Sequence, residues 1–160
     1  MKETVNIRKI WTITKYANDK DYANNKPFDV VKFEGNVVLN GGIAELIALF
    51  LGNAATAYSE ANSYLGVGDS NAAEDPTQTG LQAAVNKAYK PMSVGYPLIV
   101  SQSLVYQSVF GSADANFSWQ EFSLGNADLG AGVNFNRKIS DQGTKSAGQT
   151  FTLNLTLAFS

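Results

Sequence analysis

The last eleven positions of the chain, 150–160, alternate without interruption between large apolar side chains and smaller, mostly polar ones. The apolar positions are Phe151, Leu153, Leu155, Leu157 and Phe159. Because successive side chains of a strand point to opposite faces, this pattern predicts a β-strand with one face in a core and the other in water. Such a strand is typical of antiparallel sheets, and each large side chain would contribute about 1.5–3 kcal/mol when buried.

Shorter segments rich in β-branched and aromatic residues predict further strands at 5–16, 28–33, 64–68, 117–124 and 134–139. The segment 96–110 is also apolar, but its alternation slips by one position, which predicts one long strand with a β-bulge. Residues 17–27 have the composition of a polar loop. Residues 80–86 fit either a helical turn or a strand. Eight or nine short strands favour an all-β, mainly antiparallel fold of the β-sandwich or jelly-roll type.

One segment has the period of a helix instead. Apolar side chains recur at spacings of three and four in Ile43, Leu46, Ile47, Phe50 and Leu51. This stripe predicts a short amphipathic helix at about 41–52, and Gly52 followed by Asn53 is a typical stop signal. We expect the apolar stripe to cover one end of the β core.

The 160 residues suffice for one domain with a real core. We expect the β-sandwich to occupy residues 35–160 and residues 1–34 to form an extended N-terminal arm or strands, which could contact neighbours. This arm has seven of the twelve basic and five of the fourteen acidic groups, so its net charge is +2 and that of the remainder is −4. It could dock on an acidic partner or an acidic neighbouring copy. The alternative is a solvated strand edge that lysines keep soluble.

Charged residues make up only 16% of the chain, against roughly 25% in soluble domains. A surface of amides and hydroxyls suits contact with other protein, but strands that need few charges would give the same composition. The net charge of −2 and the pI of about 5.0 predict no nucleic-acid partner. The longest apolar run, 43–51, contains Glu45 and is about half the length of a membrane span, so we expect no membrane partner.

The sequence contains neither histidine nor cysteine, which excludes Ser–His and Cys–His catalysis. The glycines at 66 and 68 lack the rest of a phosphate-binding loop. A pair of carboxylates could hydrolyse a glycosidic bond, and the candidates are Glu121 and the cluster Asp69, Glu74 and Asp75. For Glu121 we favour a water-facing position on an edge strand. We therefore predict no enzyme, no cofactor and no metal site, with Ca²⁺ at the 69–75 loop as the alternative.

Several short motifs occur in a fixed order along the chain: NVVLNGG at 36–42, YLGVGD at 64–69, DPTQTGL at 75–81, ANFSWQEF at 115–122, NRK at 136–138 and GTK at 143–145. With the alternating segment that follows them, they resemble a group of small virion structural proteins of tailed bacteriophages. The resemblance covers residues 36–160 and leaves the N-terminal arm outside.

The resemblance implies a capsid decoration or cement protein that stabilises the head by contacts with the major capsid protein and with its own copies. A tail, collar or fibre subunit is the alternative within the virion. The expected location is the capsid surface, after synthesis in the host cytoplasm, and the expected assembly is a homo-oligomer, with a trimer favoured. A carbohydrate-binding β-sandwich with exposed Tyr and Trp side chains is the alternative outside this class.

The residues expected to make these protein contacts fall in two groups. The N-terminal segment contributes Arg8, Lys9, Trp11, Tyr16 and Tyr22. The resemblance adds Arg137, Lys138 and Lys145, which would hold the last hairpin or form an intersubunit salt bridge.

Overall fold

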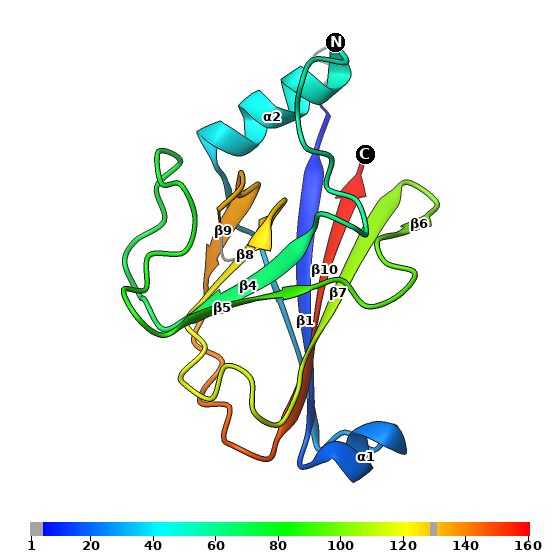
Figure 1. The fold of residues 1–160 in the computed structure, drawn as a ribbon, viewed down its shortest axis with the longest axis vertical. Coiled ribbons are helices and arrows are strands. Elements are labelled where there is room, and N and C mark those ends of the chain that lie inside the picture. Colours follow the sequence, from blue (N-terminus) through cyan, green and yellow to red (C-terminus); the bar gives the residue numbers. More distant parts are fainter. Residues whose placement is uncertain (1–4, 129–130) are drawn as a thin grey trace.

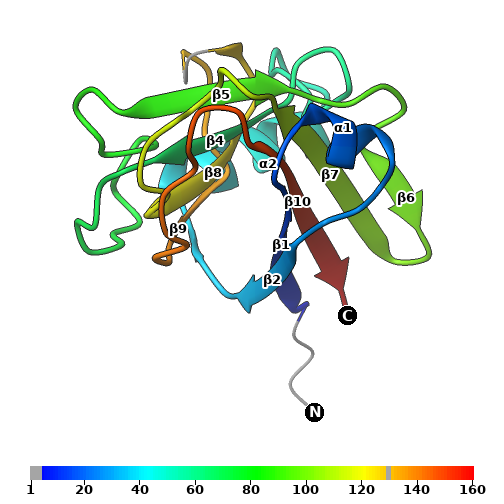
Figure 2. The same ribbon diagram turned by 90° about the horizontal axis from the view of Figure 1, so that it is seen from below.

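The computed structural model describes residues 5–128 and 131–160, which fold into two five-stranded antiparallel sheets. The first sheet has the order β2-β1-β10-β7-β6 and the second has the order β3-β9-β8-β4-β5. Figure 2 shows the two sheets as layers facing each other, and Figure 1 shows a helix at each end of the molecule. The predicted all-β, mainly antiparallel sandwich with a short helix is confirmed.

The first sheet consists of β1 (Ile7–Tyr16), β2 (Asp29–Glu34), β6 (Leu98–Val100), β7 (Ser103–Phe110) and β10 (Thr150–Phe159). The second consists of β3 (Val37–Val38), β4 (Tyr64–Gly68), β5 (Lys87–Pro91), β8 (Glu121–Gly125) and β9 (Asn136–Ile139). The helices are α1 (Asp19–Ala23) and α2 (Asn40–Phe50). Within residues 5–128 and 131–160, no helix is long and apolar enough to cross a membrane.

The alternating segment at the end of the chain forms β10, the central strand of the first sheet. It pairs with β1 along its whole length, from Thr150 opposite Tyr16 to Phe159 opposite Ile7, and with β7 on its other side. The apolar face is turned into the sandwich, where Leu153 and Leu155 are fully buried. The strand therefore has the two unlike faces that its sequence predicts.

Residues 7–34, expected to form an arm or strands outside the sandwich domain, form two strands of the first sheet and the short helix α1 between them. Trp11 and Ile13 of β1 are fully buried in the core between the sheets. This segment is thus part of the sandwich, because its apolar face supplies core side chains next to β10. Residues 1–4 of the expected arm lie outside the described part of the chain.

The segment 96–110 departs from the prediction of one bulged strand. It forms a hairpin in which β6 and β7 are joined at Ser101 and Gln102, and Ser101 adopts a positive φ of 53°. The reversal moves β6 alongside β7, and this explains why the alternation slips. The sequence also gave no sign of β5, which has only five residues, at Lys87–Pro91, three of them charged or proline.

Aromatic rings fill the space between the two sheets. Trp119 lies with its ring centroid 4.9 Å from that of Phe110 and 5.3 Å from that of Phe151. Trp11 lies 5.6 Å from Phe122. Trp119 Nε1 donates a hydrogen bond of 3.0 Å to the carbonyl of Ala115, so its one polar group is satisfied. Both tryptophan side chains are thus part of the core.

Two neighbouring positions of β10 test this arrangement. Leu155→Ala removes a fully buried side chain and should lower the free energy of unfolding by about 2–5 kcal/mol. Thr156→Val changes the outward-facing neighbour, keeps the β-branched shape, and should change that free energy by less than about 0.5 kcal/mol. Urea unfolding measures both. Similar losses for the two variants would contradict the assigned faces of β10.

Candidate functional site

The motifs that carry the resemblance come together on the second sheet. One motif contains β4, and two others overlap the beginnings of β8 and β9. The loop 69–81 lies against β9. At their meeting point Glu121 and Arg137 are both fully buried and form an ion pair, with Arg137 Nε 2.8 Å from Glu121 Oε2. This is the arrangement of charge that first suggests an active site.

Every contact of the Glu121 carboxylate is made within the chain. Oε2 accepts hydrogen bonds from Arg137 Nε and from the backbone N–H of Gln82, both at 2.8 Å. Oε1 accepts one of 2.7 Å from the backbone N–H of Ala83. The carboxylate also lies against Gly68, where a Cβ atom would collide with it, so glycine is required there. The prediction of a water-facing Glu121 is therefore wrong, because β8 lies inside the second sheet and not at its edge.

Arg137 continues the network into the loop that follows β4. Its Nη1 donates to the carbonyl of Ala72 at 2.9 Å and to Gln78 Oε1 at 3.0 Å. The same loop is attached to β9 by Glu74, whose Oε1 accepts a 2.6 Å hydrogen bond from the backbone N–H of Ile139 and lies 3.9 Å from Lys138 Nζ. Arg137 and Lys138 thus fasten this loop to the second sheet.

The buried pair of Glu121 and Arg137 holds the loop after β4 on the second sheet, and we call this pair the clamp. Both carboxylate oxygens are occupied and neither residue of the pair reaches solvent, so a substrate has no approach to them. Breaking such a pair costs far more than an exposed pair contributes, because the remaining charge stays buried without a partner. Among the described residues, no group of three acidic side chains is arranged to hold a metal ion.

Lys145 fastens a second loop. Its Nζ donates hydrogen bonds of 2.7 Å to the carbonyl of Gly111 and to Asn116 Oδ1, and it lies 5.9 Å from the ring centroid of Phe151. Burial lowers the pKa of Lys145, and the nearby carboxylates of Asp114 and Asp19 oppose this shift. The residue therefore holds the 111–116 loop near the start of β10.

The expected contact residues of the N-terminal segment lie in different settings. Trp11 and Tyr16 are buried, and Tyr16 packs edge-on against Tyr22 with centroids 5.2 Å apart. Arg8 is exposed and pairs with Glu34 of β2, while Lys9 is half-buried on the opposite face of β1. The structure therefore does not bring these five residues together into one surface.

The helix α2 does not cover the core in the predicted way. Of its apolar stripe, Leu46 packs against the core, but Ile47 is 57% and Phe50 is 96% exposed. A polar contact fixes the helix in this position: Glu45 Oε1 accepts hydrogen bonds from the backbone N–H of Thr56 at 2.8 Å and from Asn126 Nδ2 at 2.9 Å. The apolar spacing thus predicted the helix correctly, but most of its apolar side chains face outward.

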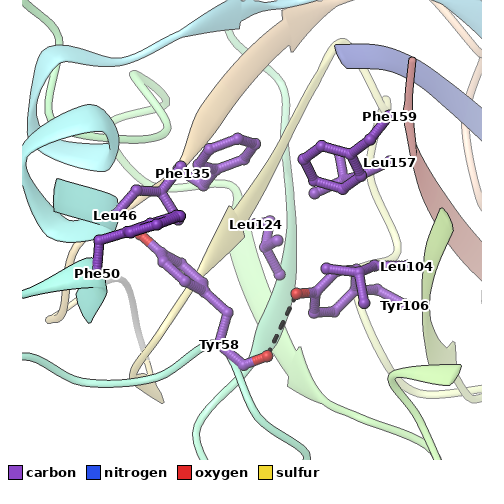
Figure 3. Close-up of a pocket in the computed structure, with 9 residues that line it drawn as sticks. All are labelled: Leu46, Phe50, Tyr58, Leu104, Tyr106, Leu124, Phe135, Leu157 and Phe159. Atoms are coloured by element: carbon purple, nitrogen blue, oxygen red, sulfur yellow. Dashed lines mark hydrogen bonds between the residues drawn. The ribbon is translucent and has the colours of Figure 1, made fainter. Parts of the chain in front are cut away.

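Beneath α2 the two sheets leave an apolar cavity of about 240 Å³ (Figure 3). Side chains of α2 and of the segment after it lie on one side, those of β7 and β10 on the other, and that of β8 between them. The lining residues are Leu46, Phe50, Tyr58, Leu104, Tyr106, Leu124, Phe135, Leu157 and Phe159. None of them is charged, and the tyrosine hydroxyls are occupied, since Tyr106 donates to the carbonyl of Tyr58 and Tyr58 to that of Val133.

The apolar surface continues beyond this cavity. Phe159 and Leu104 also line a shallow hollow next to Ile99 of β6, which is 80% exposed, and Phe159 lines another next to Val5, which is 84% exposed. We call this region, from α2 across Phe159 to β6, the open end of the sandwich. Its hollows are lined by apolar and uncharged polar residues throughout. The apolar stripe of α2 was the one sign of it in the sequence.

Burial also affects the hydroxyl groups at the open end. It raises the pKa of Tyr106 to about 12. It raises the pKa of Tyr58 as well, and the negative charge of Glu45 adds to that shift. Both hydroxyl groups therefore stay neutral at physiological pH, and they add no charge to the open end.

Comparisons of this chain with protein-family models, with curated proteins and with solved structures give no significant match. Its class is therefore defined by the fold and the site: an antiparallel two-sheet β protein with an internal ion-pair clamp and an apolar open end.

The clamp leads to a prediction about stability. Glu121→Gln should lower the free energy of unfolding by about 3–5 kcal/mol, because it leaves Arg137 buried without its counter-charge. The matched control is Glu34→Gln, which breaks the exposed pair with Arg8 and should cost less than about 1 kcal/mol. Denaturant unfolding compares the two. Equal losses would show that burial of the Glu121 pair has no energetic consequence.

The raised pKa of Tyr106 leads to a prediction about pH. Between pH 10 and pH 12 the unfolded chain loses the Tyr106 proton and the folded chain keeps it, so folding stability falls as the pH rises through this range. Tyr106→Phe should reduce that alkaline loss by about 2 kcal/mol. Unfolding curves at neutral and alkaline pH measure the difference. An alkaline loss that is identical in both proteins would contradict the prediction.

Proposed function

We propose that this chain is a non-enzymatic structural subunit of a bacteriophage virion, and specifically a capsid decoration or cement protein that binds the major capsid protein at the capsid surface. One observation carries the proposal. The open end presents Phe50, which is 96% exposed, beside a charge-free cavity of about 240 Å³. Exposed apolar groups around a hollow are typical of a surface that another protein covers.

The motifs that resemble virion proteins also support a structural role. Their charged residues Glu121, Arg137 and Lys145 are buried and bind loops of the same chain. They stabilise the shape of the second sheet and its loops. A subunit that adds contacts to a shell needs such a fixed shape, whereas it needs no reactive group.

The carbohydrate-binding alternative has less support. Stacking on sugar rings needs exposed aromatic faces. Trp11 and Trp119 are fully buried in the core, and among the described tyrosines only Tyr22 is exposed, at 38%. A tail, collar or fibre subunit would use the same open end as a capsid subunit, so the position of the protein on the particle decides between them.

Particles with and without this protein provide the direct test. Immunogold labelling should place the protein on the capsid surface, and particles that lack it should release their genome at a lower temperature than complete particles. Labelling on the tail would replace the capsid assignment by the tail or fibre assignment. If the protein is found on no part of the particle, the proposal is wrong.

A single substitution tests the role of the open end. Phe50→Asp should leave the free energy of unfolding within about 0.5 kcal/mol, because this side chain is exposed, but should weaken binding to particles that lack the protein by about 30-fold or more. Val85→Asp is the matched control: it places the same charge at an exposed valine in the β4–β5 connection. A co-sedimentation assay measures binding. Equal binding by both variants would exclude the open end as the docking surface.

A further inference from the structure

The buried charge of Lys145 has a different setting from the other two buried charges of the described chain, those of Glu121 and Arg137. Glu121 and Arg137 neutralise each other, whereas no carboxylate of the described residues forms a direct ion pair with Lys145. Its Nζ atom donates instead to two neutral oxygen atoms, the carbonyl of Gly111 and Oδ1 of Asn116, both at 2.7 Å. A buried ammonium group without a counter-charge is costly, so this position favours an uncharged nitrogen.

The side-chain amide of Asn116 is fixed by hydrogen bonds at both of its ends. Its Oδ1 accepts from Lys145 Nζ, and its Nδ2 donates to the carbonyl of Ser112 at 3.1 Å. The carbon atom of this amide is bonded to Oδ1 at about 1.2 Å, so Lys145 Nζ lies within roughly 4 Å of it. An amine held beside an amide carbon in this way is a nucleophile in position for attack.

The backbone also holds these two residues at a fixed separation. The N–H of Lys145 donates to the carbonyl of Phe117 at 3.1 Å. Ala115, which precedes Asn116, adopts a positive φ of 49°, a conformation that costs energy for a residue with a Cβ atom. The carbonyl of Ala115 accepts the hydrogen bond of the fully buried Trp119, so core packing maintains this strained turn.

Asp114 is the carboxylate best placed to transfer protons. Asp114 and Lys145 contact the same residue, since Asp114 Oδ2 accepts from the N–H of Gly111 at 2.9 Å and Lys145 donates to its carbonyl. Burial lowers the pKa of Lys145, and the negative charge of Asp114 opposes this shift more than that of Asp19 does. Both oxygens of Asp19 accept hydrogen bonds from hydroxyl groups. Asp114 pairs with Lys90 at 3.0 Å and so keeps a counter-charge when Lys145 becomes neutral.

We propose that Lys145 and Asn116 form an intramolecular isopeptide bond, with Asp114 as the group that transfers the protons. The bond between Lys145 Nζ and Asn116 Cγ forms, and the bond between Cγ and Nδ2 breaks. The ammonium group of Lys145 loses two protons, which Asp114 accepts and passes on in turn, and the nitrogen of Asn116 leaves as an ammonium ion. Atoms and charge balance without any other reactant. Solvent reaches Asn116, which gives the ammonium ion a way out.

The reaction has two consequences for the folded chain. It replaces the unpaired buried charge of Lys145 by a neutral amide. It also joins the 111–116 loop covalently to the segment that precedes β10, where hydrogen bonds already hold the two together. The bond forms once in each chain and acts on no other molecule, so it does not depend on the proposed capsid contact.

Intact-mass spectrometry of the purified, denatured full chain tests the proposal. The wild-type chain should be lighter than its sequence mass by one ammonia molecule. Trypsin should release one joined peptide that contains both Asn116 and Lys145. Lys145→Arg and Asn116→Ala should each keep the full sequence mass, and Asp114→Asn should form the bond about 100-fold more slowly or worse, because it lacks the proton acceptor.

A matched control is Lys15→Arg. Lys15 lies over the ring of Phe151 at 5.7 Å from its centroid, as Lys145 does at 5.9 Å, but it has no amide beside it, so this variant should still lose ammonia. An asparagine can also lose ammonia by cyclising onto its own backbone. That product would persist in Lys145→Arg and would give no joined peptide.

The decisive measurement is made on the wild-type chain, so a variant that fails to fold cannot produce the expected result. A wild-type chain that keeps its full mass, an ammonia loss that persists in Lys145→Arg, or a digest without the joined peptide would overturn the isopeptide bond. Bond formation at the wild-type rate in Asp114→Asn would overturn the role of Asp114.

Discussion

The pairing of β1 with β10 joins the two ends of the chain over ten residues, and the rest of the molecule is arranged around it. It places Trp11 and Leu155 side by side on the inner face, where they form part of the core. It places Ile10 and Thr156 side by side on the outer face. At one end it brings Phe159 to the open end.

The buried charges have a related role in the second sheet. Short strands such as β4 and β8 are followed by long loops, and loops without regular structure depend on side-chain contacts for a fixed position. The pair formed by Glu121 and Arg137 supplies these contacts for the loop after β4, and Lys145 supplies them for the 111–116 loop. A fixed outer shape is what a shell-binding subunit requires, so the clamp and the proposed function are consistent.

Strands were predicted correctly where one side chain in two is apolar, whereas the burial of a charged side chain was not predicted. β10 and β4 lie where their patterns predict them. Glu121 was expected in water because a carboxylate is costly to bury, and only the approach of Arg137 and of two backbone N–H groups offsets that cost. These partners are distant in sequence, so no local pattern could indicate them.

The sequence by itself determined the class of fold, the two-faced strand at 150–160 and the existence of an apolar helix, because these follow from side-chain periods of two and of three to four along the chain. That this strand is the central one is decided by its pairing with β1 and β7. Tertiary structure alone decided the direction in which α2 faces. The contacts of Glu45 with Thr56 and Asn126 hold Leu46 inward and leave Phe50 exposed, and they join segments far apart in the chain. For this reason the sequence indicates the apolar stripe of α2, but only the folded protein shows that the stripe faces outward at the open end.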